Sequence, residues 1–319
     1  MAMDLLESRL LARLAERAAE PAADPARITP RRTTDPVALS FAQQRLWFLD
    51  QLEPGSAEYL VPFAVRVSGR LDVAALEGAL SGIVARHEVL RTRFVPDEDG
   101  EPRQIMDSPW GVAVTVHDLR LGTEGIEDAE DDTAAREGEA VELLRSRARE
   151  PFDLASGRLL RADVVVVGQD DQFLLLALHH IVSDGWSEGI LAREIGEFYA
   201  AAIERRAAVL PQLPVQYADY AAWQREQLSG AVEQDQLGYW RERLAGLEPL
   251  ELPVDHHRPA ERGAAGDTVF FDVPAVVAEG LRGIASGGGA SLFMVVLAAY
   301  QVVLSRFSGQ SDVAVGTPI

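Results

Sequence analysis

The clearest pattern along the chain is a pair of apolar segments joined by a polar turn. Residues 159–180, LLRADVVVVGQDDQFLLLALHH, carry two runs of aliphatic side chains on either side of the sequence GQDD. Apolar runs of this length around a turn-forming sequence predict a β-hairpin. Because neither run alternates regularly with polar residues, we expect both faces of the hairpin to be covered and place it in the centre of its sheet.

A helix and several shorter strands are predicted on the N-terminal side of this hairpin. Leu76, Leu80 and Val84 recur at helical spacing and share one face, and Asp72 is placed to cap the start of that helix. The strongly acidic segment 121–139 is interpreted as a solvated loop. Apolar stretches of strand-like composition predict three further strands, at residues 61–69, 91–95 and 112–117.

The C-terminal part of the chain is predicted to be mostly helical. One helix is expected to run from the sequence DGWS to about residue 205, and two more follow a proline-punctuated crossing. A second set of strand, helix, helix and strand is predicted from TVFFDV, at 268–273, to DVAVGTPI, at 312–319. The apolar stretch 292–304 is shorter than the roughly 20 residues that span a bilayer, so it is interpreted as a buried helix.

These elements divide the chain into three parts. Residues 1–36 are predicted to hold a short amphipathic helix and a proline-rich linker, and residues 37–205 a first lobe that contains the hairpin. Residues 206–319 would supply helices between two lobes and part of a second lobe. A chain of 319 residues is long for one compact domain. The mixture of helices and strands predicts an α/β fold, built as a layered α+β sandwich.

The composition narrows the chemistry that the chain can perform. Its formal net charge of -20 argues against binding nucleic acid or an anionic membrane surface. There is no cysteine, so disulfides, thiolate zinc sites and cysteine nucleophiles are excluded. The N-terminus lacks the long apolar core of a secretory signal, and the protein is expected to be soluble and cytoplasmic.

Chemistry-bearing residues gather at the end of the apolar hairpin. The second strand ends in HHIVSDGWS, which holds His179, His180 and Asp184. Such a cluster can be a metal site, an acid/base site for acyl transfer, or a structural cluster without chemistry. Consecutive strand residues point to opposite faces, so the two histidines are not expected to bind one metal ion. A metal site of His180, Asp184 and a distant third ligand stays open.

An acid/base role requires one histidine beside free backbone donors. A neutral imidazole can accept or relay a proton, and N–H groups of the following turn can face a developing oxyanion. Asp184 could orient His180, but pairing with a buried arginine is favoured, and RHEVLRTRF offers Arg86, Arg91 and Arg93. No serine lies in a G-x-S-x-G context, so a covalent acyl-enzyme is not indicated.

The same residues resemble those of a known family. HHIVSDGWS is similar to the HHxxxDG signature of nonribosomal peptide synthetase condensation domains, which share it with the chloramphenicol acetyltransferase-like acyltransferases. Further stretches resemble the family's other motifs and follow in the order that the family has. They are LSFAQQRLWFLDQLEPGSAEYLVP (39–62), RHEVLRTRF (86–94), YADYAAWQ (217–224) and VAVGTPI (313–319), with PFDLASGRLLRA (151–162) and LPVDHHRP (252–259) between them.

The resemblance implies a fold and a role for each residue of the cluster. Family members are V-shaped pseudo-dimers of two chloramphenicol acetyltransferase-like lobes with a tunnel between them; here the second lobe would be incomplete, since members are usually much longer. His180 and Gly185 would be catalytic, the first facing the tunnel and the second offering its backbone N–H to the reaction centre. His179 would pack inward, and Asp184 would pair with Arg91. Trp186 and Ser187 would line the tunnel.

The implied reaction is peptide bond formation between two carrier-bound substrates. The α-amine of a downstream aminoacyl thioester would attack an upstream acyl thioester. Both would arrive on phosphopantetheine arms of peptidyl carrier proteins, with an adenylation domain adjacent. The domain itself would bind no cofactor and no metal. The motif HHIVSDG argues against heterocyclisation, and the likeness of residues 39–62 favours the class that joins two L-residues over epimerisation domains.

Two other functions remain open at this point. A stand-alone acyltransferase that uses coenzyme A would share HHxxxDG but would lack the carrier-synthetase motifs at both ends. A noncatalytic carrier-docking module could keep the fold without turnover, although the intact His180 speaks against degeneration. The fragment given by this sequence is not expected to condense substrates efficiently by itself.

Overall fold

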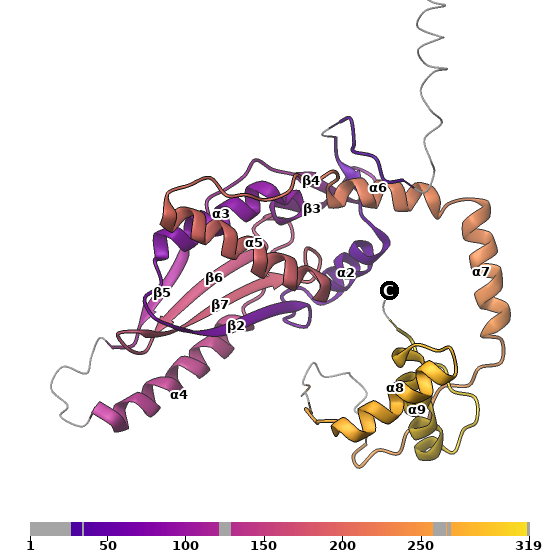
Figure 1. Ribbon diagram of the computed structural model, residues 1–319. Helices are drawn as coiled ribbons and strands as arrows, with labels where there is room; N and C mark the ends of the chain where they lie inside the picture. The colour runs from indigo at the N-terminus through magenta and orange to yellow at the C-terminus, as the bar shows by residue number, and fades with distance from the viewer. Residues whose placement is uncertain (1–26, 34, 121–128, 258–265, 267–268, 318–319) are drawn as a thin grey trace, which may run out of the picture. The chain divides into compact units, whose positions relative to one another are not determined.

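The computed structural model describes residues 27–33, 35–120, 129–257, 266 and 269–317, and of residues 129–133 only the backbone (Figure 1). The chain divides into two compact units, one that extends to Ser229 and one that begins at Gly230. Each unit is described by itself.

A four-stranded sheet is the centre of the first unit. Its strand order is β2-β7-β6-β5, and the strands are β2 (Leu60–Ser68), β5 (Val114–Asp118), β6 (Leu160–Val166) and β7 (Asp171–His179). The hairpin predicted from the apolar pattern is confirmed, because β6 and β7 pair antiparallel and occupy the two central positions. The parallel pairing of β5 with β6 was not predicted from the sequence.

Both faces of the hairpin are covered, as its continuous apolar sequence predicts. Helices α3 (Val73–Arg86) and α5 (Gly185–Glu204) lie on one face, and α4 (Ala129–Ala148) lies on the other (Figure 1). Helices α3 and α5 approach each other closely. Gly82 of α3 lies so near Phe198 of α5 that a Cβ at Gly82 would be 2.9 Å from the ring of Phe198. Residues of β6 alternate between the two cores: Leu160, Ala162 and Val164 pack toward α3, and Val165 packs toward α4.

The acidic segment is partly helical, so its interpretation as a loop was wrong from residue 129 onward. Helix α4 covers 129–148, whereas residues 121–128 lie outside the described part of the chain. Its later turns bury Ala140 and Leu144 against the sheet, while Glu142 faces solvent. Acidic residues on the outer face of an amphipathic helix therefore gave the segment the composition of a loop.

A smaller three-stranded sheet lies beside the first. Its order is β1-β4-β3, and all its pairings are antiparallel. The strand predicted at 91–95 is confirmed as β3, while β4 was not foreseen. Its strands and the neighbouring short elements are β1 (Val37–Ala38), β3 (Thr92–Pro96), β4 (Pro102–Met106), the helix α2 (Phe41–Leu52) and the 3-10 helix η1 (Glu88–Arg91).

Part of the predicted linker is bound to the first unit. The backbone N–H of Arg31 donates to Asp219 at 2.9 Å, and its guanidinium donates to Glu88 at 2.6 Å. Asp219 belongs to α6 (Tyr217–Gln227), which also contacts β1. The boundary predicted at 205/206 falls before α6, whereas the structure groups α6 with the first unit.

The second unit contains the predicted helices but, in its described residues, not the predicted strands. Its helices are α7 (Ala231–Arg243), α8 (Ala275–Gly287) and α9 (Leu292–Ser308). Residues 269–273 and 312–317 lie in neither a helix nor a paired strand. A strand forms only against a hydrogen-bonding partner. Helix α9 buries Leu304 and leaves most other apolar side chains exposed, so the expectation of a buried helix was wrong for this unit.

Within the described residues, a single helix that is long and apolar enough to cross a membrane is not found. Helices α8 and α9 pass a test of length and composition only when taken together, and they are bent by 111° relative to each other.

Candidate active site

The two histidines lie in a tight turn that joins β7 to α5. The N–H of His180 donates to the carbonyl of Tyr59 at 2.8 Å, which extends the pairing of β2 with β7 by one residue. The N–H of Val182 donates to the carbonyl of His179 at 3.0 Å and closes the turn. As the strand geometry predicts, the side chains separate: His179 is 4% exposed, whereas His180 lies on the exposed side.

His179 is a structural residue held in its neutral form. Its Nδ1 accepts a hydrogen bond from the N–H of Ile181 at 3.0 Å, so this nitrogen carries no proton. Burial, followed by the positive charge of a protonated His180, lowers the pKa of His179 to about 4. The residue therefore stabilises the turn as an acceptor and is not available as a base.

This burial predicts a pH-dependent stability. Between pH 6.5 and about 4 the unfolded chain binds a proton at His179 that the folded protein does not, so stability is lost as the pH falls through this window. The loss should reach up to about 3 kcal/mol. Urea unfolding of the wild-type protein and His179→Asn across this range measures it. Equal pH slopes for the two proteins would contradict the assignment.

His180 is held in one tautomer by the turn that it opens. Its Nδ1 lies 2.7 Å from the carbonyl oxygen of Ser183. Because a carbonyl only accepts, Nδ1 carries the proton of the neutral ring and donates it in this hydrogen bond. The lone pair is therefore on Nε2. A neutral imidazole fixed in this way can accept a proton from a substrate at Nε2.

Asp184 caps the helix that follows the turn. It precedes α5, and its Oδ1 accepts from the N–H of Ser187 at 2.9 Å and from the Ser187 hydroxyl at 2.6 Å. Burial raises the pKa of Asp184, but the hydrogen bonds from Ser187 and from the N–H of Trp186, together with the charge of His180, lower it, and the net direction is downward. A carboxylate at this position also interacts favourably with the helix dipole.

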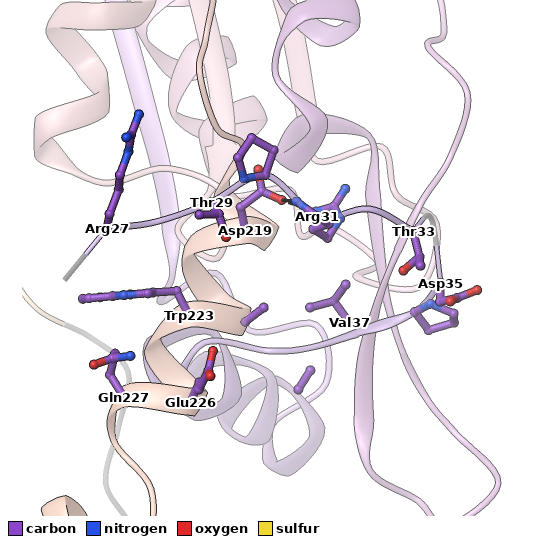
Figure 2. Close-up of a pocket in the computed structure, with 14 residues that line it drawn as sticks. Arg27, Thr29, Arg31, Thr33, Asp35, Val37, Asp219, Trp223, Glu226 and Gln227 are labelled. Carbon is purple, nitrogen blue, oxygen red and sulfur yellow. Dashed lines mark hydrogen bonds and ion pairs between the residues drawn. The ribbon is translucent and has the colours of Figure 1, made fainter. Parts of the chain in front are cut away.

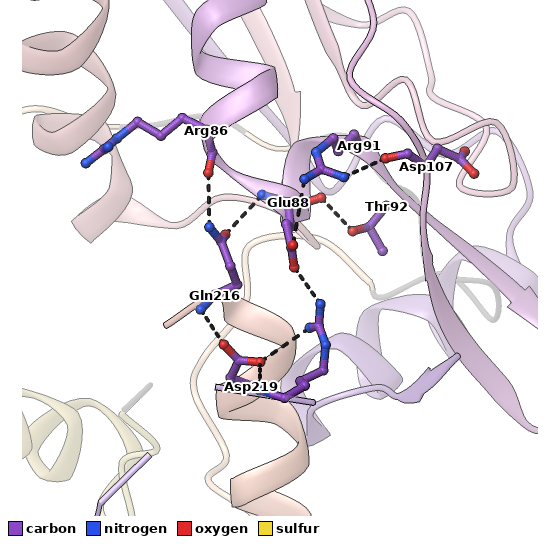
Figure 3. Close-up of polar contacts among 8 residues, drawn as sticks. Arg86, Glu88, Arg91, Thr92, Asp107, Gln216 and Asp219 are labelled. Carbon is purple, nitrogen blue, oxygen red and sulfur yellow. Dashed lines mark hydrogen bonds and ion pairs between the residues drawn. The ribbon is translucent and has the colours of Figure 1, made fainter. Parts of the chain in front are cut away.

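The predicted ion pair between Asp184 and Arg91 is not formed. The Arg91 guanidinium donates to the carbonyl of Asp107 at 2.6 Å and lies 3.7 Å from the Glu88 carboxylate, one helical turn before it (Figure 3). The other two candidate arginines are also bound elsewhere. Arg86 pairs with Glu194 and Arg93 pairs with Asp107. The prediction failed because the Asp184 carboxylate accepts its hydrogen bonds from Ser187, in the first turn of the helix that it caps.

Loss of this cap has a modest expected effect. Asp184→Ala should lower the free energy of unfolding by about 1 kcal/mol, the usual value of an N-cap, whereas breaking a buried ion pair would cost about 3–5 kcal/mol. Asp184→Ser keeps a capping oxygen and is the matched control. Denaturant unfolding of both variants measures the difference, and a loss of several kcal/mol in Asp184→Ala would contradict the capping role.

The residues after Asp184 begin α5 and lie at the surface of the first unit. Gly185 is the first helical residue, where backbone N–H groups have no partner within the helix. A Cβ at Gly185 would meet nothing within 4 Å, so packing inside this unit does not require a glycine. Trp186 is 85% exposed, and the hydroxyl of Ser187 is used by the cap.

The structure adds three residues that the sequence analysis did not single out. Gln43 is 1% exposed and donates from Nε2 to the carbonyl of Ile181 at 3.4 Å. It forms a capping box with Ser40, whose hydroxyl lies 3.1 Å from that of Tyr217. The sequence S-x-x-Q, which is typical of a capping box, could have predicted the pairing of Ser40 with Gln43 but not the contacts with Ile181 and Tyr217.

Neither a cluster of metal-ligating side chains nor the described pocket coincides with this turn. In the described part of the chain, no group of three or more His, Cys, Asp or Glu side chains is placed to hold a metal ion. A pocket of about 560 Å³ lies between the N-terminal arm and α6 (Figure 2). Its lining includes Arg27, Thr29, Asp219 and Trp223, but no residue of the histidine turn.

Comparison with solved structures assigns the fold. The X-domain from teicoplanin biosynthesis matches with a TM-score of 0.74 and 29% sequence identity, over 90% of this chain and 61% of that one. The first condensation domain of the CDA synthetase matches with a TM-score of 0.66 and 26% identity, over 88% and 64%. The X-domain is also known in a complex with OxyB. The fold is therefore a chloramphenicol acetyltransferase-like condensation-domain fold, a mixed α/β architecture with two sheets among the residues that the structure describes.

Sequence comparison assigns the family. The sequence model of the condensation domain matches residues 33–319. The chain is 44% identical over 293 residues to a linear gramicidin synthase protein of Brevibacillus parabrevis, and 43% identical over 293 residues to phosphinothricin tripeptide synthetase PhsC of Streptomyces viridochromogenes. It covers 4% and 26% of those two proteins. The chain belongs to the condensation domain family.

Proposed function

We propose that this domain forms a peptide bond in nonribosomal peptide synthesis. The amine of a downstream carrier-bound aminoacyl thioester attacks an upstream carrier-bound acyl or peptidyl thioester. The observation that carries the proposal is the position of His180 within the family motif, with its Nδ1 bound to the Ser183 carbonyl and its Nε2 left as the base.

The reaction depends more on positioning the two substrates and removing the amine proton than on a strong base. An α-amine has a pKa of about 7.7–8.0, so on the order of a tenth of it is free at pH 7. The amine nitrogen bonds to the thioester carbon, and its proton passes to Nε2 of His180. The carbon–sulfur bond then breaks, and the departing thiolate or solvent takes the proton from the imidazolium. Positioning of the two substrates supplies much of the barrier reduction.

The residues after His180 complete the proposed site. The N–H of Gly185 stabilises the oxyanion that develops on the thioester oxygen, as unpaired helix N-termini can do. The absence of a side chain at Gly185 leaves that N–H open to a substrate. Trp186, which is exposed beside the turn, lines the tunnel between two lobes of a V-shaped pseudo-dimer. Ser187 contributes to the tunnel lining as part of the first turn of α5. Its hydroxyl is already bound to Asp184.

The partners follow from the same proposal. Upstream and downstream peptidyl carrier proteins deliver the substrates on phosphopantetheine arms, and an adenylation domain loads the acceptor. Both substrates are L-residues, on the likeness of residues 39–62 to that class. Relatives of this chain are large synthetase proteins of which it covers a small share, which fits a domain that works between others.

Reconstitution with loaded carriers tests the function. The intact synthetase, with an acylated upstream carrier and an aminoacylated downstream carrier, is expected to give the amide on the downstream carrier, detected by intact-protein mass spectrometry. Omitting either loaded carrier should abolish the product. Transfer from free acyl-coenzyme A at the same rate would favour a stand-alone acyltransferase. No product from two correctly loaded carriers would favour a docking module.

A further inference from the structure

We propose that Gln43 is a positioning residue for His180. This inference rests on the proposed function and assigns a role to a buried amide that the reaction itself does not use. Gln43 lies in α2, and its side chain connects the start of that helix to the turn that carries the histidine.

Two hydrogen bonds fix the Gln43 amide. Its Oε1 accepts from the N–H of Ser40 at 3.1 Å, and its Nε2 donates to the carbonyl of Ile181 at 3.4 Å. The N–H of Gln43 donates to the Ser40 hydroxyl at 3.2 Å, and that hydroxyl contacts the hydroxyl of Tyr217 at 3.1 Å. Burial raises the pKa of Tyr217, which keeps its hydroxyl protonated. The start of α2, which carries the Gln43 amide, is thus connected through the Ser40 hydroxyl to Tyr217 of α6.

The carbonyl that Gln43 contacts belongs to the residue immediately after His180. Ile181 is buried, and the residues after it close back on the ring of His180 through the Ser183 carbonyl. A hydrogen bond to the Ile181 carbonyl therefore holds the part of the turn that decides which nitrogen of His180 is protonated. Without it, the Ser183 carbonyl is freer to leave Nδ1, and Nε2 is no longer fixed as the base.

The burial of Gln43 gives a physical reason for this role. A buried amide costs free energy unless both of its ends are hydrogen-bonded, and an apolar side chain of the same size would avoid that cost. Capping of α2 requires an acceptor at this position but no donor. The donor end of Gln43 is the part that capping leaves unexplained, and it faces the histidine turn.

Gln43→Met in the intact synthetase tests the proposal, since it keeps the length of the side chain and removes the donor and the acceptor. Misplacement of a catalytic group by about 1 Å can cost up to ~10²-fold in rate, so we expect kcat to fall at least about tenfold with KM for the loaded carriers unchanged. Long-range ¹H–¹⁵N spectra should show His180 in both tautomers. Gln43→Asn, which is too short to reach both partners, should behave alike if Gln43→Met does not fold.

The control is Asp72→Ala, which removes the N-cap of α3 at a distance from the turn in sequence and in hydrogen bonding. It should lower stability by a similar amount without changing kcat or the tautomer. Wild-type kcat in the folded Gln43 variants, or an equal loss in Asp72→Ala, would overturn the positioning role. Failure of the wild-type synthetase to form any amide would instead overturn the proposed function.

Discussion

Replacing His180 by alanine is expected to lower the rate of amide formation by about 10²-fold or more, the usual contribution of a positioned acid/base group. The ring supplies Nε2 as the acceptor of the amine proton, because its Nδ1 donates to the Ser183 carbonyl. Single-turnover formation of the amide by the intact synthetase, with both carriers loaded, measures the loss.

The loss should not come from unfolding. The His180 side chain lies on the exposed side of the turn, and its hydrogen bond to the Ser183 carbonyl stays within that turn, so His180→Ala should retain nearly the stability of the wild type. His257→Ala, which removes an exposed histidine outside the turn, is the matched control and should keep the full rate. A His180→Ala protein that condenses its substrates at the wild-type rate would contradict the assignment.

Replacing Asp163 by alanine is expected to give the largest loss of stability. Asp163 lies on β6, is 0% exposed, and accepts hydrogen bonds from Arg147 at 2.8 Å and from His117 at 2.9 Å. Removing the carboxylate takes away the buried partner of Arg147 and leaves that arginine only its pair with the partly exposed Glu150. Breaking a buried pair from one side typically costs about 3–5 kcal/mol.

Denaturant unfolding measures this loss, and the chain contains a suitable control. Arg145 and Glu142 pair on the same helix, α4, but their side chains are 66% and 72% exposed. Glu142→Ala should change stability by about 0.5 kcal/mol or less, because solvent screens exposed pairs. If Asp163→Ala and Glu142→Ala had equal effects, the cluster around Asp163 would not be a source of stability.

Much of the fold could be predicted because its signals are local. The apolar hairpin, the helix after DGWS and the Asp72 cap all follow from periodicity and capping chemistry within a few residues. The separation of His179 from His180 follows from strand alternation in the same way. The acidic helix α4 was missed because its buried stripe is narrow and its solvent face is strongly charged.

The failures concern partners that are distant in sequence or compete with closer ones. Asp184 was assigned a distant arginine, yet Ser187 lies three residues away and offers both an N–H and a hydroxyl. The connection of Gln43 to Ile181 spans 138 residues, and periodicity carries no information about it. Strands expected in the second unit need an edge to pair with, which their own sequence does not provide.

The tautomer of His180 is the most direct measure of how the site works. Histidine-selective ¹⁵N labelling and long-range ¹H–¹⁵N spectra, recorded where the imidazole is neutral, distinguish the two nitrogens, and His180→Ala identifies the signals. The structure predicts a protonated Nδ1, bound to the Ser183 carbonyl, and a bare Nε2. A proton on Nε2 would contradict it, because the lone pair would then point into the turn and no base would face the substrates.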